Sequence, residues 1–175
     1  MILLISMCSD KLHELEFVKP IENVVGKCLV RHYKNFTLKD IEKADKVIIS
    51  GTSLKDDFFL KELERFNWIR DYAKPVLGIC AGMQIISLIF RGKLRKKKEI
   101  GYYRENFVKE FLSLKDEHEV YHLHNNYVSL PKDFIKFTDS KIPQAIKHNS
   151  KNIYGVLFHP EVRNSKLIEE FLNLV

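Results

Sequence analysis

The first half of the chain alternates short apolar runs with longer, more polar stretches. Four runs rich in Ile, Val and Leu are bounded by polar residues, Gly or Pro: MILLIS (1–6), KCLVRHY (27–33), DKVIIS (45–50) and KPVLGI (74–79). Apolar runs without alternation are typical of parallel strands that are buried on both faces. We therefore expect four parallel strands within the first eighty residues.

Three stretches predict helices. Apolar side chains recur at spacings of two and three within residues 54–73, at Phe58, Leu60, Leu63, Phe66, Ile69 and Tyr72. GMQIISLIF (82–90) has little polar surface, which predicts a central helix. NSKLIEEFLNLV (164–175) is amphipathic, with Asn164 or Ser165 as its expected N-cap.

The second half is strand-like and joined by short turns. The segments are NFVKEFLSL (106–114), HEVYHLHNNYVSLP (118–131), DFIKFTDSKIPQAIKH (133–148) and NIYGVLFHPE (152–161). Alternating strands and helices followed by a patch of strands predict a three-layer α/β fold, with a mainly parallel, flavodoxin-like sheet and an antiparallel extension. A chain of 175 residues, 45% of them hydrophobic, has apolar surface for one core, so we expect a single domain over 1–175.

Composition excludes several classes of protein. Three widely spaced cysteines form neither a disulfide framework nor a paired zinc motif, which favours a reduced, cytoplasmic location. The start of the chain has neither a positive leader nor a long apolar stretch, so no secretion signal and no membrane span are expected. The net charge is +6, and the most basic stretch is RGKLRKKKEI (91–100). Without interleaved aromatic residues this run predicts a solvated face first and a partner contact second, and no nucleic-acid binding.

Candidate chemistry begins at Gly78-x-Cys80-x-Gly82, which joins an expected strand to an expected helix. Glycines on both sides permit a sharp turn that exposes the middle side chain, and the positive end of the helix favours a thiolate. The pattern therefore indicates a nucleophile. The alternative is a small apolar Cys80 buried in an ordinary tight turn.

A base for this nucleophile is expected in YGVLFHPEV (154–162). Pro160 ends strand pairing, so His159 is predicted at the carboxyl edge of the sheet, where Cys80 is also expected. In an extended segment, positions two apart face the same side, so Glu161 can orient the imidazole of His159. Alone, His-Pro-Glu is more often a charged surface turn, but beside the Cys80 turn it favours a catalytic triad.

These residues carry a resemblance to a known family. GICAGMQ (78–84) together with YGVLFHPE (154–161) resembles the class I glutamine amidotransferases. VIISGTS (47–53) is similar to the strand and oxyanion loop of that family, and YHLHNNYVSLPKDF (121–134) resembles a segment of GMP synthase amidotransferase subunits, which are the nearest in motif. The resemblance covers the chain from Lys46 onward.

The resemblance implies a set of roles. Cys80 would attack the side-chain amide of L-glutamine to form a thioester, His159 would move the proton, and Glu161 would orient His159. Backbone N–H groups of Ala81 and of Gly51-Thr52 would hold the oxyanion. The glutamine pocket would be lined by Gln84 and by the backbone of Leu123 and His124. No cofactor or metal is implied.

The chain departs from the family pattern at three places. Thr52-Ser53 replaces the usual Gly-Pro, Asn125-Asn126 replaces a pair that usually includes an acid, and the first loop is not glycine-rich. His122-x-His124 could supply two metal ligands on one strand face, but the sequence suggests no third ligand nearby, which favours histidines with local hydrogen bonds. Cys8 and Cys28 are expected to be inert packing residues.

Three functions from different classes stay open. The first is a glutaminase that passes ammonia to a separate synthetase subunit, with GMP synthesis as the leading acceptor reaction. The second is a stand-alone γ-glutamyl hydrolase or peptidase, whose secreted forms would need a signal segment. The third is a catalytically silent regulatory module, suggested by the altered Gly51-Thr52-Ser53 loop.

Overall fold

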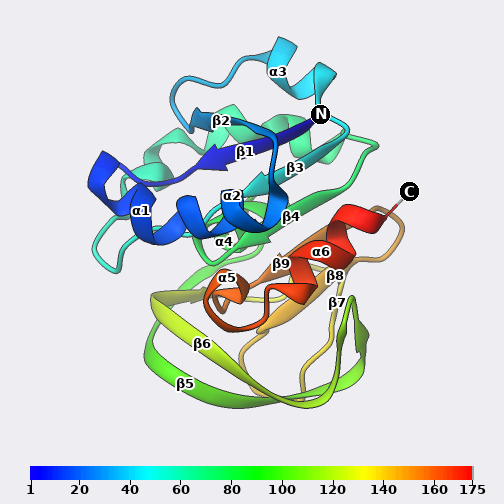
Figure 1. The fold of residues 1–175 in the computed structure, drawn as a ribbon. Helices are drawn as coiled ribbons and strands as arrows, with labels where there is room; N and C mark the ends of the chain where they lie inside the picture. Colours follow the sequence, from blue (N-terminus) through cyan, green and yellow to red (C-terminus); the bar gives the residue numbers. More distant parts are fainter. Residues whose placement is uncertain (175) are drawn as a thin grey trace.

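The computed structural model describes residues 1–174, so Val175, the last residue of the expected domain and of the expected final helix, lies outside the described residues. Seven strands form one sheet in the order β2-β1-β3-β4-β9-β8-β7 (Figure 1). Their bounds are β1 Ile2–Ser6, β2 Cys28–His32, β3 Lys46–Ile49, β4 Val76–Ile79, β7 Phe134–Lys136, β8 Ala145–His148 and β9 Ile153–Val156. The first five strands in this order are parallel to one another. β8 pairs antiparallel with β9, and β7 pairs antiparallel with β8. The predicted mainly parallel sheet with an antiparallel extension is confirmed.

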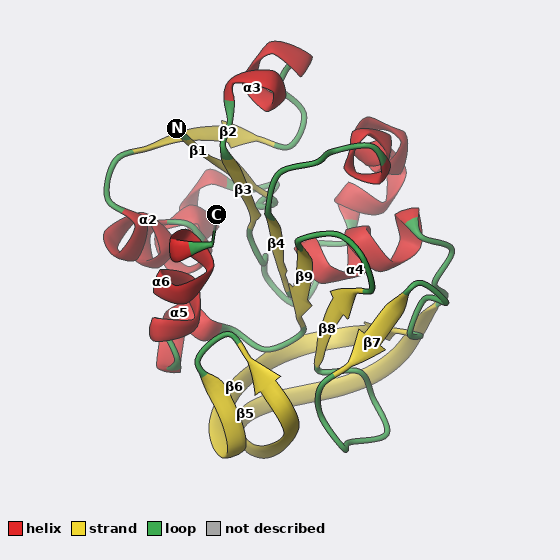
Figure 2. Cartoon of the chain, turned by 90° about the vertical axis from the view of Figure 1, so that its right-hand side faces the viewer, coloured by secondary structure: helices red, strands yellow, loops and turns green. Residues whose placement is uncertain are grey.

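Helices cover both faces of this sheet (Figure 2). One layer holds α1 (Glu14–Phe17), α2 (Lys19–Val25), α5 (Pro160–Arg163) and α6 (Lys166–Asn173). The other holds α4 (Ala81–Ile89) and the 3₁₀ segment η2 (Phe58–Arg70), and the short η1 (Lys11–His13) and α3 (Leu38–Lys43) lie in connections. Side chains of β1 alternate between the two cores, with Leu3 and Ile5 in one and Leu4 in the other. The prediction of burial on both faces is confirmed for β1, β3 and β4, whereas β2, at the edge of the sheet, is half-buried.

The expected helix over residues 54–73 is wrong in type. The structure has a 3₁₀ segment, Phe58–Arg70, with a break in helical geometry at Glu62. A 3₁₀-helix has about three residues per turn, which matches the spacing of three from Leu60 to Tyr72 better than an α-helix does. Phe66 and Ile69 are buried, whereas Phe58, outside that spacing, is 56% exposed.

Ser165 takes the N-cap position of α6, one of the two expected residues, but it does not cap the helix with its side chain. It has helical backbone angles, and its side chain makes no capping hydrogen bond within residues 1–174. The backbone carbonyl of Asn164 accepts the N–H of Leu167 at 2.9 Å instead. Only Asn164 and Ser165 separate α5 from α6. Leu167 and Phe171 of α6 are buried in the core with side chains of the sheet.

A long hairpin of β5 (Leu94–Phe111) and β6 (Leu114–Val128) forms a second, two-stranded sheet (Figures 1 and 2). The basic run enters β5 at Leu94, and Lys96 pairs with Asn126 of β6. A register shift between Lys96 and Glu99 interrupts the ladder, and Glu99 is buried whereas the lysines before it are exposed. An extra residue in one strand re-aims the side chains that follow it, so this irregularity accounts for the inward direction of Glu99.

Within residues 1–174, no helix is both long enough and apolar enough to cross a membrane.

Candidate functional site

Cys80 lies in the sharp turn between β4 and α4. It has φ 50° and ψ −101°, a positive φ that L-residues rarely adopt. A Cβ on Gly78 would lie 2.5 Å from the carbonyl carbon of Gly82, and a Cβ on Gly82 would lie 2.3 Å from the backbone oxygen of Ile49. Both glycines are therefore required by close backbone approach. The expected exposure of the Cys80 side chain is wrong, because Cys80 is only 4% exposed.

His159 and Glu161 form a buried pair after β9. Nδ1 of His159 lies 2.8 Å from Oε1 of Glu161, and the side chains are 1% and 0% exposed. The backbone N–H of His159 donates to the carbonyl of Tyr121 at 2.8 Å, which ties this segment to β6. The expected pairing is present, but its expected cause is wrong. His159 precedes α5, and Pro160 and Glu161 occupy the first turn of that helix, not an extended strand.

Gly51 brings the cysteine and the histidine together. A Cβ on Gly51 would lie 2.6 Å from Cε1 of His159 and 3.4 Å from Cβ of Cys80. Nε2 of His159 is buried and has no hydrogen-bond partner within residues 1–174. One imidazole nitrogen is thus held by Glu161, and the other is free to serve the thiol.

The electrostatics of this group favour a protonated imidazole. Burial, the strongest single influence, lowers the pKa of His159, but the neighbouring charges of Glu161 and Cys80 and the hydrogen bond with Glu161 together raise it well above 6.5. A protonated imidazole beside a cysteine stabilises the thiolate. Burial raises the pKa of Cys8 to about 11 and also raises the pKa of Cys28. These two thiols are therefore poor nucleophiles at neutral pH.

A pocket of about 250 Å³, counting its open mouth, lies over Cys80. Its lining includes the predicted residues Thr52, Cys80, Ala81, Gln84, Leu123 and His124. The thiol of Cys80 donates to the carbonyl of Leu123 at 3.7 Å. Nε2 of Gln84 donates to the carbonyl of Asn126 at 3.2 Å. The pocket residues predicted at distant points of the sequence are thus in one place.

The lining also contains residues that the sequence did not predict: Ser53, Leu54, Asp56, Asp57, Phe59, Asn125 and Asn126. The amide of Asn125 donates to the carbonyl of Leu54 at 2.7 Å, and the amide of Asn126 lies 3.3 Å from Asp57. These two asparagines, noted only as departures from the family pattern, fasten the loop after β3 to strand β6. The sequence did offer one signal for them: Asn125 and Asn126 directly follow the predicted pocket residues Leu123 and His124 in the same strand.

Asp56 fixes the same loop from the other side. Its Oδ2 accepts the hydroxyl of Thr52 at 2.7 Å and the backbone N–H of Ser9 at 2.7 Å. The thiol of Cys8 lies 3.9 Å from the carbonyl of Gly51. The hydroxyl of Thr52 is therefore engaged in holding the loop, which leaves its backbone as the group that can face a ligand.

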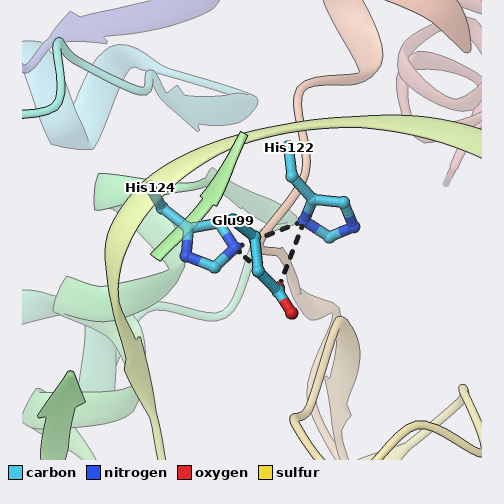
Figure 3. Close-up of side chains that lie close together, drawn as sticks. All are labelled: Glu99, His122 and His124. Atoms are coloured by element: carbon cyan, nitrogen blue, oxygen red, sulfur yellow. Dashed lines mark hydrogen bonds and ion pairs between the residues drawn. The ribbon is translucent and has the colours of Figure 1, made fainter. Parts of the chain in front are cut away.

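His122 and His124 make the expected local contact, Nδ1 to Nε2 at 3.2 Å, but they also have a third neighbour that the sequence did not suggest. Figure 3 shows both imidazoles directed toward the carboxylate of Glu99 from β5, which lies directly opposite His124 in the hairpin. The register shift at residues 96–99 brings Glu99 inward, and no local pattern in the sequence revealed it. Burial, followed by the charge of His122, lowers the pKa of His124 to about 4.

Comparison with known proteins places this geometry in a family. Residues 21–174 match the family described as glutamine amidotransferase class-I. The chain is 31% identical over 152 residues to a glutamine-hydrolyzing GMP synthase subunit of Sulfolobus acidocaldarius, covering 79% of each chain. It is 32% identical over 165 residues to the corresponding subunit of Methanosarcina mazei, covering 81% of this chain and 86% of the relative.

A longer relative and a solved structure point to the same family and fold. A glutamine-hydrolyzing GMP synthase of Spiroplasma kunkelii is 34% identical over 137 residues, which are 73% of this chain but only 26% of that protein. A crystal structure of a putative GMP synthase subunit from Thermoplasma acidophilum shares the fold, with a TM-score of 0.85 at 24% identity, covering 98% of this chain and 92% of that one. The chain belongs to the class I glutamine amidotransferase family.

Proposed function

We propose that this chain is the glutaminase subunit of a two-subunit synthetase and that Cys80, His159 and Glu161 are its catalytic residues. The observation that carries the proposal is the close packing of Gly51 against both His159 and Cys80, with Cys80 lining a pocket and Glu161 bound to Nδ1 of His159. A nucleophile, a base and an orienting carboxylate in this arrangement are sufficient for acyl transfer.

The first half of the reaction forms a thioester. The Cys80 thiolate attacks the side-chain carbonyl carbon of glutamine, and the resulting oxyanion accepts hydrogen bonds from the N–H groups of Ala81 and of the Gly51-Thr52 loop. The carbon–nitrogen bond then breaks as the imidazolium of His159 gives its proton to the leaving nitrogen. Ammonia leaves, and a γ-glutamyl thioester remains on Cys80.

The second half hydrolyses the thioester. Neutral His159 takes a proton from water while the oxygen attacks the thioester carbon, and the Cys80 thiolate leaves as glutamate forms. Glu161 keeps Nδ1 of His159 protonated throughout, so that Nε2 is the nitrogen that exchanges the proton. The sum is glutamine plus water giving glutamate plus ammonia, and these side chains are sufficient for each step.

The ammonia is passed to a separate synthetase subunit, and formation of GMP is the acceptor reaction that the relatives favour. Two relatives named as single subunits of GMP synthase match the chain over most of their length, whereas it spans about a quarter of the longer GMP synthase. A surface hollow beside the glutamine pocket supports a docking face there. It is lined by Asp57, Asn125, Asn126 and the lysines Lys96, Lys97 and Lys98.

This hollow revises the expected role of the basic run. The run was expected to form a solvated face first and a partner contact second, and β5 brings three of its lysines beside the pocket over Cys80. Asp57, Asn125 and Asn126 belong to both the hollow and the glutamine pocket. A partner bound over the lysines would therefore touch the residues that fasten the oxyanion loop.

Glutamine hydrolysis by the purified chain, with and without its synthetase, tests the proposal. Wild type should release ammonia from glutamine, Cys80→Ala should not, and Glu161→Gln should retain more turnover than His159→Ala. Activity on γ-glutamyl peptides but not on glutamine would instead indicate the hydrolase, and no activity in either setting would indicate the silent module.

A further inference from the structure

We propose that Glu99, His122 and His124 form a binding site for a divalent transition-metal ion, Zn²⁺ by the chemistry of the ligands, in the β5–β6 hairpin. The site contains none of the proposed catalytic residues and does not depend on the proposed reaction, although His124 also lines the pocket over Cys80. It rests on the positions of three ligand atoms, one from each residue (Figure 3).

The three atoms have the spacing of metal ligands. Nδ1 of His122 lies 3.2 Å from Nε2 of His124, which lies 3.1 Å from Oε2 of Glu99. The third side, from Nδ1 of His122 to Oε2 of Glu99, is 3.8 Å. Ligands bound tetrahedrally to Zn²⁺ at about 2.0 to 2.1 Å are about 3.3 to 3.4 Å apart, and two imidazoles with one carboxylate are a common zinc set.

Hydrogen bonds satisfy this triangle less completely than a cation would. A single proton on Nε2 of His124 must be shared between Nδ1 of His122 at 3.2 Å and Oε2 of Glu99 at 3.1 Å, and no proton then lies between Nδ1 of His122 and that oxygen, 3.8 Å apart. A proton on Nδ1 of His122 leaves the lone pair of His124 facing the same oxygen at 3.1 Å. Protons on both nitrogens oppose each other at 3.2 Å. A central cation is attractive to all three atoms.

The surroundings support the ligands. Nε2 of His122, on the side away from the triangle, lies 3.4 Å from Oε1 of Glu105, and Nε2 of Gln144 donates to Oε2 of Glu99 at 3.0 Å. Metal-bound imidazoles and carboxylates usually have such outer partners, which fix their orientation. Opposite His122 in the hairpin lies Gly101, which has no side chain to fill the space.

One neighbour opposes the cation. Nζ of Lys97 lies 3.7 Å from Oε1 of Glu99, so its positive charge competes for the carboxylate. Removing this contact should therefore raise the metal affinity, whereas removing a ligand should lower it. Lys97→Met should tighten metal binding, whereas Lys96→Met, which removes an equal charge from the same strand, should change it less because Lys96 has no contact with Glu99 among those described.

The test is equilibrium dialysis of the metal-stripped chain against Zn²⁺ and Co²⁺, followed by metal analysis. Wild type should bind one equivalent, and Co²⁺ should give the intense visible absorption of a four-coordinate site without a thiolate charge-transfer band. Glu99→Gln and His122→Gln should lose this binding, and Glu105→Gln should weaken it by about 10- to 100-fold. His118→Gln, a histidine of the same strand outside the cluster, and Cys80→Ser should bind as wild type does.

Several outcomes would overturn the site: no stoichiometric binding by wild type, retention of wild-type affinity in both ligand variants, or loss of binding in Cys80→Ser. A readout on wild type alone removes dependence on variant folding. Zn²⁺ should shift the ring NMR signals of His122 and His124 and leave those of His32 and His148 in place. Shifts confined to His159 would place the metal at the thiol and contradict the proposal.

Discussion

Gly51 packs directly against the imidazole of His159, so that a Cβ at position 51 would lie 2.6 Å from Cε1 of the ring. Since Cβ contacts this short do not occur, Gly51→Ala must displace the ring, the loop or both. We expect kcat for glutamine hydrolysis to fall by roughly 100-fold, the effect of misplacing a catalytic group by about 1 Å. Steady-state kinetics check this, and Ser53→Ala, in the same loop, is the control. Wild-type turnover in Gly51→Ala would mean that the loop moves away from His159 during catalysis.

A diazo-ketone analogue of glutamine should label Cys80 and neither Cys8 nor Cys28. Cys80 lies beside a protonated imidazole, whereas burial raises the pKa of Cys8 to about 11 and also raises the pKa of Cys28. Mass spectrometry of tryptic peptides locates the adduct. His159→Gln should slow the labelling, and an adduct on Cys28 alone would contradict the assignment of Cys80.

Replacing Thr52 separates its backbone from its hydroxyl. Thr52→Pro removes the N–H that we assign to the oxyanion and should lower turnover by on the order of 100-fold or more. Thr52→Gly keeps the N–H and should retain activity. Thr52→Ser also keeps the hydroxyl bound to Asp56. Comparison of kcat for the three variants decides the point, since equal losses for Gly and Pro would assign the effect to loop conformation.

Glu161→Gln should lower the pKa of His159, because the negative charge of Glu161 is one of the influences that raise it. In wild type the native pKa lies above the ordinary value of 6.5, so protonation stabilises the fold below pH 6.5 and this contribution is lost as the pH rises through the native pKa. NMR titration of the His159 ring measures the first effect.

Urea unfolding against pH measures the second effect. The stability of wild type relative to His159→Gln should fall as the pH rises above 6.5. A wild-type titration midpoint below 6.5, or a stability difference that grows with pH, would reverse the sign derived for this group.

Charge reversal should reveal whether the lysines beside the pocket bind the synthetase. Lys96→Glu with Lys98→Glu should reduce activation by the partner and weaken its salt dependence, while glutamine hydrolysis by the isolated chain stays as in wild type. Lys39→Glu with Lys43→Glu, on α3, is the control. Activation that survives reversal with unchanged salt dependence would exclude this face as the contact.

The sequence predicted the parts of the site that depend on local pattern. Gly78 and Gly82 mark the turn at Cys80 because their backbones touch other backbones, and His159 with Glu161 is a motif two residues apart. The partners of β6 were not predictable in this way, because they are set by pairing across the hairpin and by contacts with the distant loop after β3. Asn125 reaches Leu54 over 71 positions, and Glu99 meets His124 only after the register shift in β5. The spacing of three between apolar residues from Leu60 to Tyr72 was present in the sequence, but it was interpreted as an α-helix and not as the 3₁₀-helix that the structure has.

The irregular pairing between Lys96 and Glu99 also determines how the hairpin tolerates length changes. Side chains of β6 alternate in direction, so His122 and His124 point inward while Leu123, whose carbonyl meets Cys80, points the other way. β5 has two residues, Lys97 and Lys98, where β6 has only Asn125, so deleting one of the two lysines would restore a regular ladder with Glu99 still opposite His124. Deleting Asn125 would instead leave two residues of β5 without a partner in β6. Length changes that keep Glu99 opposite His124 should therefore be losses of the extra residue in β5 or changes in the turn at Leu112 and Ser113.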